Sequence, residues 1–173
     1  YFAVKTLWFL VRKVVIFMAN EVKVFDVNDA NKNIFIRPYE HNAKYYETDQ
    51  MGIIHHSNYI RWMEEARVDY LARHGWHLQK LEEMGVVSPV TAVECQYKHT
   101  TTFADVVSIR VFVTQCTGVR MKLRYEMEKG DGTPVFVGTS EHCFLGEGGR
   151  IVRLKKEYPD LYQTLVGLME NDK

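Results

Sequence analysis

The feature that most constrains the fold is a change in the period of the apolar side chains along the chain. Residues 119–128 alternate strictly between apolar and charged side chains. The apolar positions are Val119, Met121, Leu123, Tyr125 and Met127. A period of two buries one face of a strand and leaves the other in solvent, as in an antiparallel sheet that is packed on one side. Residues 105–114 alternate in the same way, so we expect at least two such strands.

A helical period precedes these strands. Over residues 58–73, apolar side chains recur at spacings of three and four, which predicts a long helix with one apolar stripe. The stripe consists of Tyr59, Trp62, Met63, Ala66 and Tyr70. We expect Ser57 or Asn58 to cap the helix start and Gly75 to end the helix.

The remaining segments are shorter and complete the order of elements. We expect strands over residues 34–47 (interrupted around 38–42), 87–98, 134–145 and 150–154, short helices over 77–84 and from Pro159 onward, a loop over 49–57, and turns over 130–134 and 146–149. A run of strands that follows one long helix favours an α+β fold over an alternating α/β fold. One curved antiparallel sheet could cover the apolar stripe of the helix.

Composition narrows the class of protein. The 173 residues carry 22 basic and 22 acidic side chains, and 46% are hydrophobic. This is typical of one globular domain and argues against a nucleic-acid-binding protein, which is usually basic. Cys95, Cys116 and Cys143 form no CxxC pair, so we expect reduced thiols and a cytoplasmic location.

The first 18 residues differ from the rest of the chain. Two apolar runs, 7–11 and 14–18, are separated by Arg12 and Lys13. Neither run reaches the roughly 20 residues that span a bilayer, so we expect no stable membrane insertion. We interpret residues 1–18 as an N-terminal extension outside the native domain, and residues 19–173 as a single domain. A membrane-surface anchor is the alternative.

The segment 45–59 carries the residues that are most suggestive of chemistry. Asp49 directly follows the end of a predicted strand, Gly52 permits a tight backbone path, and His56 lies at the start of the long helix. Amide groups at a helix start stabilise anions, so a carbonyl next to Asp49 could meet an oxyanion hole. The carboxylate could then act as a nucleophile or as a general base. The alternative is that Asp49 is only a turn residue.

The stretch from Tyr45 to Gly75 resembles the signature of the 4-hydroxybenzoyl-CoA thioesterase family. It is most similar to the branch of short-chain acyl-CoA thioesterases that are encoded near the Tol–Pal system. The family pattern is Tyr-x-x-x-Asp-x-x-Gly-[apolar]-[apolar]-x-His-x-x-Tyr, followed by a helix of Glu-x-Ala-Arg character. The matching residues here are Tyr45, Asp49, Gly52, Ile53, Ile54, His56, Tyr59 and the helical segment 64–67.

The resemblance implies a hotdog fold, in which a curved antiparallel sheet wraps a long central helix, and a homo-oligomer, either a dimer or a tetramer. It implies that Asp49 is the catalytic carboxylate, that the His56 backbone N–H polarises the thioester carbonyl, and that Tyr45 lies near Asp49. The other motif residues are assigned to substrate binding: Gly52, Ile53, Ile54, Asn58 and Tyr59. No cofactor and no metal are expected. The predicted activity is hydrolysis of an acyl-CoA to the free acid and CoA.

Two alternatives remain open from the residues. A second hotdog lineage uses a helical Glu, for which Glu64 and Glu65 are candidates, although surface ion pairing is the simpler role for both. A hotdog domain could also bind acyl-CoA without cleaving it.

The family often has a proline at position 100 or 101 and a glycine at position 104, where this chain has Thr100, Thr101 and Ala104. Lys98, Arg120 and Arg150 are candidate contacts for CoA phosphates.

Overall fold

The computed structural model describes residues 13–18, 21–26 and 37–169. The chain divides into two compact units, residues 1–36 and 37–173. In the first unit, β1 (Lys13–Met18) pairs antiparallel with β2 (Glu21–Asp26). The predicted boundary after residue 18 falls between these two strands and stays a prediction.

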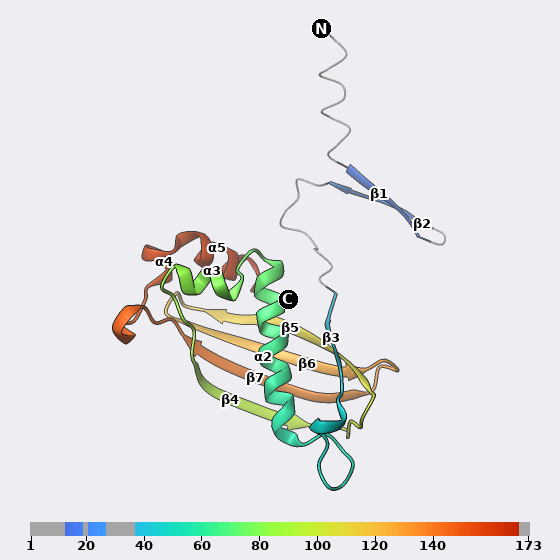
Figure 1. Cartoon of the computed structure of the whole chain (residues 1–173). Helices are drawn as coiled ribbons and strands as arrows, with labels where there is room; N and C mark the ends of the chain where they lie inside the picture. The colour runs from blue at the N-terminus through green and yellow to red at the C-terminus, as the bar shows by residue number, and fades with distance from the viewer. Residues whose placement is uncertain (1–12, 19–20, 27–36, 170–173) are drawn as a thin grey trace. The chain divides into compact units, whose positions relative to one another are not determined.

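The second unit is a five-stranded antiparallel sheet with a long helix across one face (Figure 1). The strand order is β3-β5-β6-β7-β4. The bounds are β3 Tyr39–Asn42, β4 Val90–Tyr97, β5 Val106–Cys116, β6 Arg120–Lys129 and β7 Pro134–Cys143. The long helix is α2, His56–Arg73, and the short helices are α3 Leu78–Glu83, α4 Leu154–Glu157 and α5 Pro159–Gly167. This arrangement is the hotdog fold, so the predicted α+β class is confirmed.

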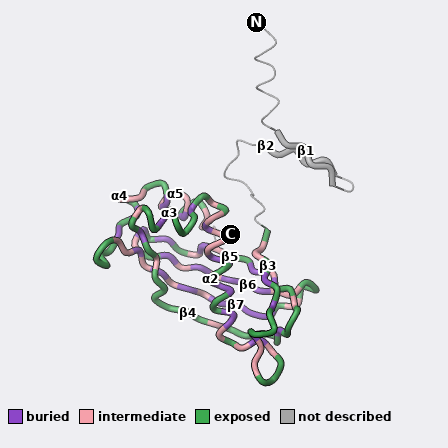
Figure 2. Tube along the Cα trace, in the orientation of Figure 1, coloured by how far each residue is buried: buried purple, intermediate pink, exposed green. Residues whose placement is uncertain are grey.

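The core lies between α2 and the concave face of the sheet, where the buried trace in Figure 2 is concentrated. The inward side chains of β6 are at most 2% exposed, namely Met121, Leu123, Tyr125 and Met127. The α2 stripe is buried at Tyr59, Trp62, Met63 and Ala66. Tyr70 is only half-buried, because the stripe continues through Leu71 instead. The two hydrophobic periods in the sequence therefore do form the two packed faces.

Several element boundaries differ from the sequence prediction. Instead of one strand over 34–47, the described part contains β3 and then a 3₁₀ helix, η2 (Tyr45–Glu47), while residues 34–36 lie outside the described residues. The predicted strand 150–154 is wrong, because only Ile151 bridges to Leu145 before α4 begins.

The start of α2 also differs from the prediction. The helix begins at His56 and its N-cap is His55, whose Nδ1 accepts a hydrogen bond from the Ser57 N–H at 3.3 Å. Ser57 and Asn58 are therefore helical residues, and the predicted cap at either position is wrong. The stop at Gly75 is confirmed by a φ of +83°, which a glycine adopts without strain. The three cysteines are free and are buried or half-buried.

Candidate active site

Asp49 lies at the corner of a short hairpin that leads into α2. Its N–H donates to the Ile53 carbonyl at 2.8 Å, and its carbonyl accepts from the Gly52 N–H at 3.0 Å. One carboxylate oxygen accepts from the Met51 N–H at 2.8 Å, which is an Asx turn. Gly52 has a φ of +74°, so the predicted tight path does require a glycine. Asp49 is half-buried, and its carboxylate is held by the turn that it begins.

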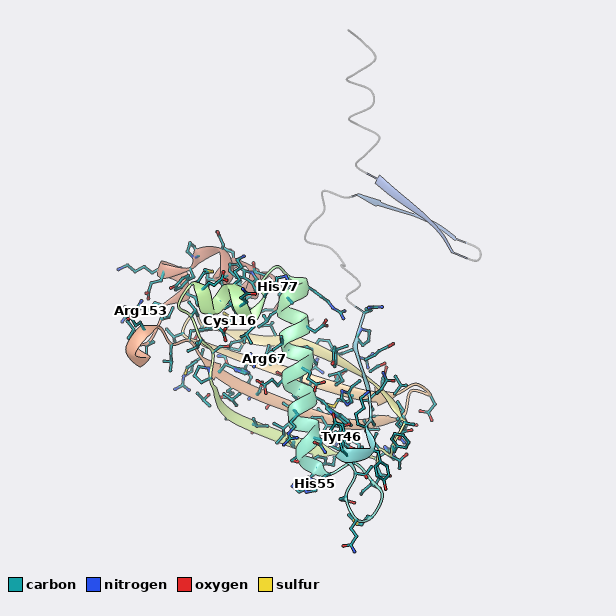
Figure 3. The ribbon with its side chains drawn as sticks, in the orientation of Figure 1. Tyr46, His55, Arg67, His77, Cys116 and Arg153 are labelled. Carbon is teal, nitrogen blue, oxygen red and sulfur yellow. The ribbon has the colours of Figure 1, made fainter. Side chains whose placement is uncertain are left out.

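The first amides of α2 follow directly after this hairpin in the chain. The Ser57 N–H is capped by His55, and the Asn58 N–H donates to the His55 carbonyl at 3.0 Å. No residue that the structure describes accepts a hydrogen bond from the His56 N–H. His56 is exposed, so this amide is a free donor at the positive end of an 18-residue helix. Figure 3 shows His55 at this end of α2.

A buried carboxylate that sequence reasoning missed joins these two parts. Glu47 is 5% exposed and lies two residues before Asp49. Its carboxylate accepts hydrogen bonds from the Lys44 N–H at 2.7 Å, the Trp62 indole at 2.7 Å and the His41 ring at 3.1 Å. Its carbonyl accepts from the His55 N–H at 2.9 Å and the Asn58 side chain at 2.8 Å.

These bonds also set the charge state of Glu47. Burial raises the pKa of the Glu47 carboxyl, but the hydrogen bonds from the Lys44 N–H, Trp62 and His41 outweigh burial, so the pKa lies below its ordinary value. Glu47 is therefore ionised at neutral pH, inside the protein and next to the candidate site. Its position in the motif, between Tyr45 and Asp49, was the only signal in the sequence that could have pointed to it.

His41 connects Glu47 to the helix. Its Nδ1 lies 3.0 Å from a carboxylate oxygen of Glu65, which also accepts from the Tyr39 hydroxyl at 3.0 Å. Both ring nitrogens of His41 therefore contact a carboxylate oxygen. The ring is 7% exposed and packs against Trp62 with a centroid distance of 4.5 Å. Strand β3, helix α2 and the Asp49 hairpin are thus tied together by one charged cluster.

Three aromatic rings pack together at the first turn of α2. Tyr59 stacks on Phe136 at 5.3 Å, and Tyr97 meets both rings edge-on at 5.4 Å. The Tyr97 hydroxyl donates to the His56 carbonyl at 3.2 Å. The first turn of α2 is therefore fixed to β4 and β7 by contacts that the sequence pattern did not reveal.

The loop over 98–105, between β4 and β5, also braces the hairpin. The Ile54 N–H donates to the Thr101 carbonyl at 2.8 Å, and Ile53 bridges to Thr102. Ala104 has a φ of +68°, the left-handed region that favours glycine. Position 104 therefore has a backbone conformation that suits glycine, although its residue is alanine.

The structure places the other predicted site residues at different depths. Ile54, Asn58 and Tyr59 are buried, so they pack beneath the surface of the candidate site. Gly52 is exposed and Ile53 is half-buried. The Tyr45 ring is 76% exposed and lies edge-on to Phe103 at 5.8 Å. The roles of these residues in substrate binding, and that of Tyr45 beside Asp49, stay predictions.

The helical carboxylates are both engaged elsewhere. Glu64 lies 3.6 Å from the Arg67 guanidinium, and Glu65 accepts from His41 and Tyr39. Among the candidate CoA contacts, Arg150 pairs with Glu157 at 2.7 Å. Within the described ranges, no three His, Cys, Asp or Glu side chains gather as a metal site. None of the helices in this part of the chain combines the length and apolar character that a bilayer-crossing helix needs.

Comparisons with known proteins agree with the fold. A sequence model of the thioesterase-like superfamily matches residues 44–163. A DHNA-CoA thioesterase from Staphylococcus aureus is 30% identical, with 74% of this chain and 87% of that chain covered and a TM-score of 0.71. The hypothetical protein TT1821 from Thermus thermophilus is 31% identical, with 76% and 98% covered and a TM-score of 0.70. A candidate acyl-CoA thioesterase of Bacillus subtilis is 30% identical over 70% of this chain and 88% of its own length.

The matched range begins just before the 3₁₀ helix that precedes Asp49 and ends within α5. It therefore includes the hairpin, the long helix and strands β4 to β7, which are the elements that build the site. The chain belongs to the thioesterase-like superfamily.

Proposed function

We propose that this protein is an acyl-CoA thioesterase, which hydrolyses an acyl-CoA to the free acid and CoA. The observation that carries the proposal is the unpartnered His56 N–H at the start of α2, in the same hairpin-to-helix segment as the Asp49 carboxylate. A thioester needs a donor for its developing oxyanion and a group that delivers the nucleophile. Relatives at about 30% identity include a DHNA-CoA thioesterase and a candidate acyl-CoA thioesterase, which supports the same reaction.

The two groups divide the chemistry between them. The His56 N–H donates to the carbonyl oxygen as the tetrahedral intermediate forms, and the helix dipole stabilises the negative charge. Asp49 removes a proton from the attacking water, or attacks the carbonyl itself to give an anhydride that water then hydrolyses. In both routes the CoA thiolate leaves and takes up a proton. Removing one oxyanion donor typically lowers kcat by about 10²–10³.

The second candidate is a domain that binds acyl-CoA without cleaving it. The hairpin geometry would serve binding as well, since a helix start also attracts a carbonyl or a phosphate. Asp49 separates the two functions, because a binding module does not need a carboxylate at the thioester. We also propose that the enzyme belongs to the short-chain thioesterase branch encoded near the Tol–Pal system and that it is cytoplasmic.

We extend the proposal to a homo-oligomer, either a dimer or a tetramer. Strand β4 is an edge of the sheet, and almost all of its side chains are exposed. Val90, Val93 and Tyr97 present apolar surface there. An edge strand with free backbone groups and apolar side chains can pair with a second copy. Analytical ultracentrifugation that finds only monomer at micromolar concentration would contradict this extension.

Asp49→Asn tests the assignment, and Asp131→Asn is its matched control. Asp131 makes the same local contact, from the Thr133 N–H to its carboxylate at 2.9 Å, in the β6–β7 turn. Thiol release would be measured over acyl-CoAs of increasing chain length and over aryl-CoAs. We expect the Asp49 variant to fold normally and lose at least about 10²-fold in kcat, as for other removed acid–base groups.

The control should keep wild-type turnover. If both variants behave alike, Asp49 is only a turn residue and the assignment is wrong. If the wild-type protein releases no thiol from any acyl-CoA but binds one by calorimetry, the binding module becomes the better description.

A further inference from the structure

We infer that Glu47 and His41 form a buried, hydrogen-bonded clamp that positions Asp49 relative to the His56 N–H. This inference rests on the proposed roles of Asp49 and His56. Glu47 is separated from Asp49 by one residue, and its carbonyl holds His55, which directly precedes His56. Both halves of the proposed site are therefore fixed to the same residue.

The clamp restrains the hairpin from both sides. The Glu47 carboxylate is held by the Lys44 N–H and the His41 ring at the end of β3, and by Trp62 from within α2. The Glu47 carbonyl is held by His55 and Asn58 at the first turn of α2. These five bonds leave little freedom for the backbone that enters the Asp49 turn. A shift of about 1 Å in a catalytic group can cost about 10²-fold in rate, so such restraint matters for a hydrolase.

The chemistry of the clamp favours a positioning role over a purely stabilising one. A buried charge is costly unless donors surround it, and apolar residues of similar volume can fill such a site with equal stability. Glu47 and His41 are both less than a tenth exposed, yet both make charge-assisted hydrogen bonds. Such bonds fix direction as well as distance, which apolar packing does not. Glu65 and Tyr39 complete the cluster on the solvent side of His41.

Glu47→Gln is the central variant, because it keeps the shape of the side chain. It places an amide N–H₂ where a donor already points, so at least one of the three carboxylate bonds must break. We expect kcat for thiol release to fall by about 10–100-fold, in line with a misplaced catalytic group, while KM changes less than threefold. His41→Phe keeps an aromatic ring against Trp62 and removes one of the three donors, so its loss in kcat should be smaller.

Ser140→Ala controls for a general loss of stability. Ser140 is equally buried and bonds to Tyr125 and His142, at 2.9 and 2.8 Å, in the core away from the hairpin. We expect this variant to lower the melting temperature and keep kcat at 25 °C. If Ser140→Ala and Glu47→Gln lose equal stability and equal kcat, the clamp is merely structural and the inference is overturned.

Hydrogen exchange gives a readout that does not depend on activity. In Glu47→Gln, the amides of Asp49 and His55 should exchange at least about tenfold faster, while those of β6 stay unchanged. Unchanged exchange at the hairpin would overturn the inference even if the wild-type protein hydrolyses nothing. If Glu47→Gln does not fold, the same two measurements on His41→Phe decide the question. Retained activity in Asp49→Asn would instead count against the proposed function alone.

Discussion

Gly138 on β7 offers a sharp test of how packing supports the candidate site. A Cβ atom added there would lie 2.6 and 2.8 Å from two ring carbons of Phe136, and 2.9 Å from the Glu94 carbonyl of β4. Ordinary contacts begin at about 3.4 Å. Phe136 is fully buried and stacks on Tyr59, so neither its ring nor the paired backbone of β4 can move freely.

We expect Gly138→Ala to destabilise the protein. Overpacking typically costs about 1–3 kcal/mol, and this site lies at the upper end because two rigid neighbours must move. Alanine restricts the unfolded chain more than glycine does, which offsets about 0.4–1 kcal/mol. The expected net loss is about 2 kcal/mol, which lowers the melting temperature by about 6–8 °C in a domain of this size.

Thermal and urea unfolding, followed by circular dichroism, would measure this loss. Gly130→Ala is the matched control, because nothing lies within 4 Å of a Cβ atom at Gly130. The control should stay within about 1 kcal/mol of wild type. A Gly138→Ala variant as stable as the control would refute the reasoning, because it would show that Phe136 or β4 yields freely. Phe136 supports Tyr59 and Tyr97, so the same variant should also lower thiol release.

Two further predictions concern the backbone and the charges near the hairpin. Ala104→Gly should raise stability by about 0.5–1 kcal/mol in urea unfolding, because relief of the left-handed strain at φ +68° exceeds the entropic cost of glycine; a less stable variant would contradict this. Stability should also fall in acid. Burial raises the pKa values of Glu47 and Asp105, but hydrogen bonds to both carboxyls (for Asp105 chiefly from Lys129) outweigh it and hold both values below normal. The stabilisation is complete above the unfolded pKa of about 4 and is lost as the pH falls through the lower folded pKa values. The urea concentration at the unfolding midpoint should therefore decrease once the pH falls below about 4, and this decrease should be smaller in Glu47→Gln.

The long elements of the fold were predictable because the spacing of their apolar residues shows which face is buried. The alternation of 119–128 and the stripe of 58–73 each need only one apolar face, and both faces pack as expected. The short elements were not predictable in this way. Residues 45–47 contain two tyrosines, which favour a strand, yet they form a 3₁₀ helix that is exposed except at Glu47. Tertiary hydrogen bonds to Glu47 decide that conformation.

The motif located the candidate site but not its support. Asp49, Gly52 and His56 were identified from the order of residue types and from the family resemblance. Glu47, His41 and Trp62 meet only after β3 and α2 have packed, and the sequence separations of His41 and Trp62 from Glu47 carry no periodic signal. Single-sequence reasoning therefore finds residues that define a reaction more readily than residues that hold them in place.

Glu47 and Asp49 show how the environment separates two neighbouring carboxylates. Glu47 is surrounded by three donors, and each of its carboxylate oxygens is engaged. Asp49 accepts from the Met51 N–H through Oδ1 and is half-buried. A carboxylate that activates water needs accessible lone pairs, which Glu47 lacks. If the two residues were exchanged in function, Glu47→Gln would abolish turnover and Asp49→Asn would spare it, which is the reverse of the order that we predict.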